Sequence, residues 1–203
     1  FTLATLSAEL SAEFSLFRHD DTLRKYLNGR ASTDYEPVDP DPDAAYDEII
    51  RIDISKIEPL VVLPHKVAHN ATEANLLAET KIDQAFIGSC ANGRIEDFEV
   101  AAEIMSGRQV APGVRMIVTP GSQKVLQEAL AKGYVETLMS AGAVVTNSTC
   151  GACYGGHMGV LGDGEVCITA STRNFQGRMG SPEAEIYLGS PATVAASAVR
   201  GFI

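Results

Sequence analysis

The chain has 203 residues, of which 45% are hydrophobic and 21% are charged, and its formal net charge is −10. This size and composition are ordinary for a globular protein with a sizeable core, whereas the acidic balance and the scattered 16 Lys and Arg argue against nucleic-acid binding, which needs a clustered cationic face. No apolar stretch approaches the ~18 residues that span a bilayer, and the N-terminus lacks the basic region of a signal peptide, so we expect a cytoplasmic protein.

The first third of the chain is predicted to be helical and then irregular. Apolar spacing predicts helices over residues 2–17 and 20–28. An acidic segment rich in Pro and Asp, about 30–47, cannot form a continuous helix or a central strand, so we expect a linker there. Two short extended segments are predicted at 49–54 and 60–63.

From Lys81 onward, strands are predicted to alternate with helices. The strands are expected at 85–87, 116–118, 144–145 and 166–169, and the helices at 95–105, 122–133, 135–140 and 190–201. This alternation predicts an α/β fold, a three-layer α/β/α arrangement with a mainly parallel sheet. In such sheets ligands bind at the carboxyl ends of the strands.

Three cysteines lie in short Gly- and Asn-rich segments that follow these strands. Cys90 follows the strand at 85–87, and Cys150 and Cys153 follow the strand at 144–145. Three thiolates are one ligand short of a closed tetrahedral site, and a metal that does chemistry keeps one position open for water or substrate. Cys167 lies inside a predicted strand and is expected to be a core residue.

Several kinds of cysteine site are compatible with this spacing. Cys150 and Cys153 form a C-x-x-C pair like that of dithiol oxidoreductases, although the glycines that follow do not favour the usual helix. A zinc site that adds His157 and a set of unreactive loop thiols are further alternatives. The glycines favour an iron–sulfur cluster, because a bulky inorganic core needs close approach of the backbone and its N–H groups.

Two arginines, Arg173 and Arg178, lie in a glycine-containing loop after the last predicted strand. Guanidinium groups bind carboxylates bidentately, so this loop is predicted to hold a di- or tricarboxylate. Two solvated surface arginines are the alternative.

Together these segments resemble the aconitase superfamily, especially the large subunits of 3-isopropylmalate dehydratases and homoaconitases. The matching segments are Gly88-Ser89-Cys90-Ala91-Asn92-Gly93-Arg94, Cys150 to His157, and Arg173-Asn174-Phe175-Gln176-Gly177-Arg178. Glu9 falls where the family has an active-site Glu on a helix, while Thr5, Ala91 and Thr172 depart from the family pattern. The resemblance implies that residues 67–203 form a cluster-bearing α/β domain and that residues 1–66 are a remnant of a preceding subdomain. It also implies further sequence upstream of Phe1.

The resemblance also implies a function and its cofactor. It implies a hydro-lyase of leucine biosynthesis that isomerises a hydroxy di- or tricarboxylate such as 3-isopropylmalate, with a [4Fe-4S] cluster on Cys90, Cys150 and Cys153 and one open iron site. Glu9 is the implied catalytic residue, Arg173 and Arg178 the implied substrate-binding residues, and a separate small subunit the implied source of a serine base. A homoaconitate or methylmalate dehydratase and a non-catalytic zinc- or iron-binding domain are the alternatives.

Overall fold

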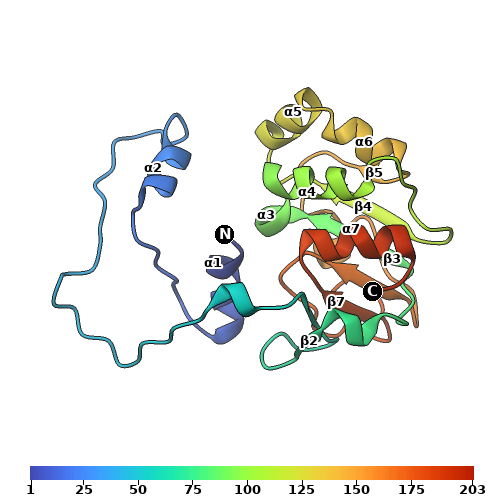
Figure 1. Cartoon of the computed structure of the whole chain (residues 1–203), viewed down its shortest axis with the longest axis horizontal. Coiled ribbons are helices and arrows are strands. Elements are labelled where there is room, and N and C mark those ends of the chain that lie inside the picture. The colour runs from blue at the N-terminus through green and yellow to red at the C-terminus, as the bar shows by residue number, and fades with distance from the viewer.

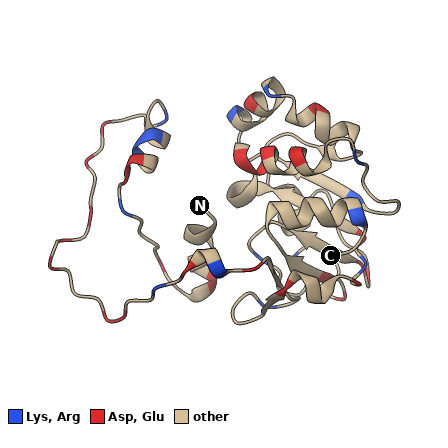
Figure 2. Ribbon diagram, in the orientation of Figure 1, with Lys and Arg blue, Asp and Glu red and all other residues tan.

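The computed structural model describes all 203 residues, and its compact part begins at Leu60 (Figure 1). Residues 28–59 run beside it as an open arc in which every residue is exposed. As predicted, the acidic segment at 30–47 forms neither helix nor strand, and Figure 2 shows Asp and Glu positions spaced along this arc. The assignment of residues 30–47 as a linker within 1–66, and the division of the chain into 1–66 and 67–203, stay predictions. None of the helices combines the length and the hydropathy that a membrane span requires.

A seven-stranded mixed sheet forms the centre of the compact part. Its strands are β1 (Leu60–Val62), β2 (Ala71–Glu73), β3 (Gln84–Gly88), β4 (Arg115–Thr119), β5 (Val144–Val145), β6 (Val166–Thr169) and β7 (Glu185–Leu188), in the spatial order β2-β1-β7-β6-β3-β4-β5. The five strands from β7 to β5 are parallel, and β1 is antiparallel to both of its neighbours. The predicted α/β class with a mainly parallel sheet is therefore confirmed.

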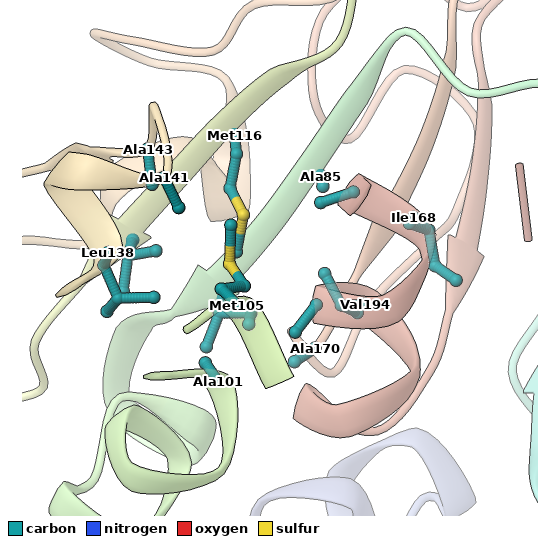
Figure 3. Packing of buried hydrophobic residues seen from close by; sticks show 14 of the residues in the cluster. Ala85, Ala101, Met105, Met116, Leu138, Ala141, Ala143, Ile168, Ala170 and Val194 are labelled. Atoms are coloured by element: carbon teal, nitrogen blue, oxygen red, sulfur yellow. The ribbon is translucent and has the colours of Figure 1, made fainter. Parts of the chain in front are cut away.

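One face of the sheet is covered by helices. They are α4 (Ile95–Met105), α5 (Gln123–Ala131), α6 (Tyr134–Ser140) and α7 (Pro191–Arg200), with α4 and α7 packed against each other and α7 packed against β3. Met105 of α4 and Met116 of β4 meet in the core between these layers (Figure 3). Alternate strand residues, such as Ala85 and Ile87, point into this core, as the two-residue period of a strand requires.

The opposite face of the sheet carries the intervening strand residues. Phe86, Ile117 and Cys167 pack there against Ala152 and Met179. The covering layer is the short 3-10 helix η4 (Gly151–Tyr154) and the loops around β6, in place of the α-helices of the predicted third layer. These loops contain many glycines and cannot continue as helices.

The structure differs from the predicted elements mainly at the start of the chain. Instead of one helix over residues 2–17, α1 (Thr2–Leu6) runs into a 3-10 turn, η1 (Ser7–Leu10), and the helix predicted at 20–28 is α2 (Asp21–Leu27). Helices as short as these depend on burial of an apolar face, and Phe14 and Leu16 remain largely exposed. No strand forms at 49–54, where the 3-10 turn η2 (Ile54–Lys56) begins.

Two strands were not predicted, β2 and β7. Neither contains consecutive β-branched residues such as the Val144-Val145 pair of β5, so no strand signal stands out in the sequence. The remaining short elements are α3 (Ser89–Asn92) and the 3-10 helix η3 (Ala74–Leu77).

Candidate functional site

The segments that carry the predicted site residues lie at one edge of the sheet. Because β3, β5 and β6 run parallel, their carboxyl ends share that edge. Cys90 follows β3, Cys150 follows β5 and Arg173 follows β6. This is the edge at which open α/β sheets bind ligands.

Cys90 lies in α3, immediately after the sharp turn that ends β3. Gly88 and Ser89 both have positive φ values, 149° and 66°. A Cβ at Gly88 would lie 2.3 Å from the carbonyl oxygen of Thr119 in β4, so only glycine fits there. The turn leaves Cys90 exposed, and its carbonyl oxygen accepts a hydrogen bond from Arg94 Nη2 at 2.8 Å.

The Cys150–Cys153 segment forms a tight turn against the sheet. Cys150 is exposed and immediately precedes η4, whereas Cys153 lies within η4 and is 7% exposed. Gly151 and Gly155 have left-handed backbones, and a Cβ on either would lie within 2.6 Å of Thr119 Oγ1 or of the Met179 backbone, respectively. The backbone therefore lies so close to its surroundings at these two positions that only glycine fits.

Arg178 is held against this cysteine turn. Its Nε donates to the carbonyl oxygen of Cys153 at 2.8 Å, and its Nη2 lies 3.7 Å from the Cys153 sulfur. The guanidinium also lies over the ring of Phe175, 5.3 Å from the centroid. Arg178 therefore places a positive charge directly beside the Cys153 sulfur.

Arg173 pairs with Glu9. Its Nε lies 2.6 Å from Glu9 Oε1, and both side chains are about three-quarters buried, with 28% and 23% exposed. The structure thus brings together two predicted site residues from opposite ends of the chain. Arg173 and Arg178 contact different partners and do not bind one common protein group.

The side chains at this edge do not form a site for a single metal ion. No group of three or more His, Cys, Asp or Glu side chains in the structure is close enough to hold one. The zinc alternative with Cys90, Cys150, Cys153 and His157 is therefore not supported, because zinc draws all its ligands to within about 2.3 Å of one point. A four-iron cluster does not require this convergence, since each thiolate binds a different iron.

The chemistry of this edge fits a cluster of that kind. Three free thiols can supply anionic ligands, and the glycines in their turns allow the backbone to approach closely. The guanidinium of Arg178 adds a positive charge beside one of the thiols. Ser148 Oγ, two residues before Cys150, is buried without a hydrogen-bond partner. Cys167 does not belong to this set, because it is fully buried in β6 and burial raises the pKa of its thiol to about 12.

Two further residues help to build the site although no role was predicted for them. Arg94 reaches back to Cys90 and places its guanidinium over the ring of Phe1, 3.9 Å from the centroid. Asn92 accepts a hydrogen bond from Thr2 Oγ1 at 2.8 Å, which joins α3 to α1. Both lie in the segment around Cys90, but nothing in their spacing indicates contact with the N-terminus.

Curated relatives match the whole chain. It is 58% identical over 202 residues to the 3-isopropylmalate dehydratase large subunit of Mycolicibacterium smegmatis and 49% identical over 203 residues to that of Moorella thermoacetica. It is 47% identical over 204 residues to 3-isopropylmalate dehydratase large subunit 2 of Archaeoglobus fulgidus. Each alignment covers 100% of this chain but only 48% or 49% of the relative, so the chain spans about half the length of these proteins.

The comparison with protein families gives the same assignment. Residues 1–201 match the Aconitase family (aconitate hydratase). This match covers nearly the whole chain and includes all three loop cysteines and the arginine loop. The chain belongs to the aconitase family.

Proposed function

We propose that this chain is the cluster-bearing part of a hydro-lyase that isomerises a hydroxy dicarboxylate of the 3-isopropylmalate type by dehydration and rehydration. The proposal is carried by the sheet edge, which the three thiols in their glycine-containing turns share with the Arg173–Glu9 pair. The relatives' names support the substrate class and a role in leucine biosynthesis. Their designation as large subunits supports a separate small subunit as partner.

Cys90, Cys150 and Cys153 would hold a [4Fe-4S] cluster, which supplies a Lewis-acidic iron for the substrate hydroxyl when it is bound. Arg178 holds the turn that carries Cys153 through the hydrogen bond to the Cys153 carbonyl oxygen. Because Arg173 uses Nε for Glu9 and its two Nη groups have no side-chain partner, they remain available for a substrate carboxylate.

Glu9 has two tasks in this proposal. It orients Arg173 through the ion pair formed by Oε1, and its second oxygen would be available to the bound substrate. A carboxylate in this position would accept a proton, and the resulting carboxylic acid would donate it back, as water is lost from or returned to the substrate. The base that removes the carbon-bound proton is assigned to the small subunit, as the family resemblance implies.

Metal loading of cysteine variants tests the cofactor part of the proposal. After anaerobic incubation with iron and sulfide, we expect about four irons per chain, and a large loss of bound iron in Cys90→Ser, Cys150→Ser and Cys153→Ser. Cys167→Ser is the matched control, because this thiol is buried in the core and should leave the iron content unchanged.

The same variants distinguish the alternatives. Tight stoichiometric zinc without sulfide would contradict the cluster. A dithiol oxidoreductase would lose disulfide-reducing activity in Cys150→Ser and keep it in Cys90→Ser, and that pattern would also contradict the proposal.

A further inference from the structure

The turn between β1 and β2, residues 63–70, lies under the arginine loop although the two are more than 100 residues apart in sequence. The turn is closed on itself by Asn70, whose side-chain amide donates to the carbonyl oxygens of Leu63, Pro64 and Lys66 at 2.8, 3.3 and 3.0 Å. Its carbonyl groups therefore point inward and form a fixed set of acceptors.

Asn174 inserts its side chain into this set of acceptors. Its amide nitrogen lies 2.6 Å from the carbonyl oxygen of Leu63, 3.4 Å from that of Lys66 and 3.3 Å from that of Ile186 in β7. Its backbone carbonyl oxygen accepts a hydrogen bond from the backbone N–H of His65 at 3.2 Å, whereas its side-chain oxygen is buried without a hydrogen-bond partner. The side chain is fully buried, so these hydrogen bonds are sheltered from water.

The backbone of the turn is strained. His65 and His69 have φ values of 73° and 55°, in the left-handed region that residues other than glycine rarely adopt. Such conformations cost free energy and persist only where the surroundings enforce them, and they cluster at functional sites. Here the strained turn presents its carbonyl groups to Asn174.

Arg173 is the neighbour of this anchored residue. Asn174 points into the protein, while the Arg173 side chain points to the sheet edge, where it meets Glu9. On the other side, the backbone N–H of Ser171 is bound by Thr169 Oγ1 at 3.0 Å. The backbone at Arg173 is thus tied on both sides, and the direction of its guanidinium depends on the Asn174 anchor.

We infer that Asn174 is a positioning residue for Arg173, and that the 63–70 turn holds the Asn174 side chain in place. This inference rests on the proposed function, because it assigns Arg173 to the substrate carboxylate. Asn174 itself touches no substrate and acts only through the direction of Arg173. A displacement of about 1 Å at such a group can cost a hundredfold in rate.

The test uses the full-length large subunit in complex with its small subunit. We expect Asn174→Ala and Asn174→Ser to raise KM for the hydroxy dicarboxylate about tenfold to a hundredfold, with a smaller change in kcat and with an unchanged iron content. The matched control is Gln84→Ala. Gln84 is also a fully buried amide that donates to a loop carbonyl, that of Gly159 at 3.0 Å, but it lies at the amino end of β3.

A chemical readout tests the anchor without any turnover. In the same complexes, labelling of Arg173 by phenylglyoxal, located by peptide mass spectrometry, should become severalfold faster in the Asn174 variants than in Gln84→Ala. Equal labelling rates in the two kinds of variant, or an equal rise in KM, would overturn the inference. Faster labelling without any hydro-lyase activity in the unmodified complex would support the anchor and contradict the proposed function.

Discussion

At the scale of single residues, the site depends on positions where only one residue type fits. The thiols and the arginines could be proposed from the sequence, because these residue types carry recognisable chemistry and stand in glycine-rich segments. The partners that hold them could not. Arg94, Asn92 and Asn174 contact segments that are distant in sequence (Phe1, Thr2 and Leu63, respectively), and a single sequence carries no record of such contacts.

Gly88 offers a direct test of the turn that presents Cys90. In Gly88→Ala the new Cβ would meet the backbone of Thr119 at 2.3 Å and the residue would keep a φ of 149°, so we expect a loss of at least ~2 kcal/mol in the free energy of unfolding. The measurement is chemical denaturation. Gly107→Ala is the control, because its φ is 70° but nothing lies within 4 Å of its Cβ. Equal losses in the two variants would show that the contact with Thr119 is unimportant.

Arg173 can be tested by a change that keeps its charge. In Arg173→Lys the ammonium cannot bind Glu9 and a substrate carboxylate in the same bidentate geometry, so we expect KM to rise about tenfold or more in the complete enzyme. Arg108→Lys, at an exposed position after α4, should leave KM unchanged. An Arg173→Lys enzyme with normal KM would remove this arginine from the substrate site.

At the scale of elements, the helices and strands from residue 81 onward were predicted closely because each carries its own signals. The helix predicted at 95–105 is α4, and Ser190 and Gly201 cap α7 as expected. The N-terminal helix was predicted too long, because its apolar spacing is helical but most of these side chains have nothing to pack against. Pattern alone does not show whether a packing partner exists.

An ion pair that joins two elements gives the fold a defined pH dependence. Arg115 of β4 binds Glu165, just before β6, with two contacts of 2.7 and 2.8 Å. The guanidinium and the Gly162 N–H hold the pKa of Glu165 below its ordinary value of 4.5. A carboxyl group with a lowered folded-state pKa stabilises the fold above its unfolded-state pKa and loses that contribution as the pH falls through the folded-state pKa.

Glu165→Gln should therefore lower stability at pH 7 by about 1 kcal/mol or less, since Arg115 is partly exposed. Unfolding curves at pH 7 and pH 3 provide the measurement. We expect the difference between the variant and the unmodified protein to shrink at the lower pH. A difference that stays constant from pH 7 to pH 3 would mean that the charge of Glu165 contributes nothing.

At the scale of the whole molecule, the sheet collects residues from all parts of the chain at one edge. Glu9 comes from the N-terminal turn, the cysteines from the loops after β3 and β5, and Arg173 from the loop after β6. Because a parallel sheet was predicted, it could also be predicted that the cysteines and the arginine loop lie at the same sheet edge. The meeting of Glu9 with Arg173 follows only from how α1 and η1 dock, and the resemblance to the family was needed to single out Glu9.

The central claim is a division of labour, in which this chain supplies the thiols and the carboxylate-binding arginine while a partner supplies the base. The most direct measurement is the dehydration of 3-isopropylmalate, followed by the absorbance of the unsaturated product. It compares the cluster-loaded full-length large subunit alone, the small subunit alone and the two together. We expect turnover only for the mixture, and its loss when the large subunit carries Cys150→Ser. Turnover by the large subunit alone, or an active mixture that contains Cys150→Ser, would contradict the account.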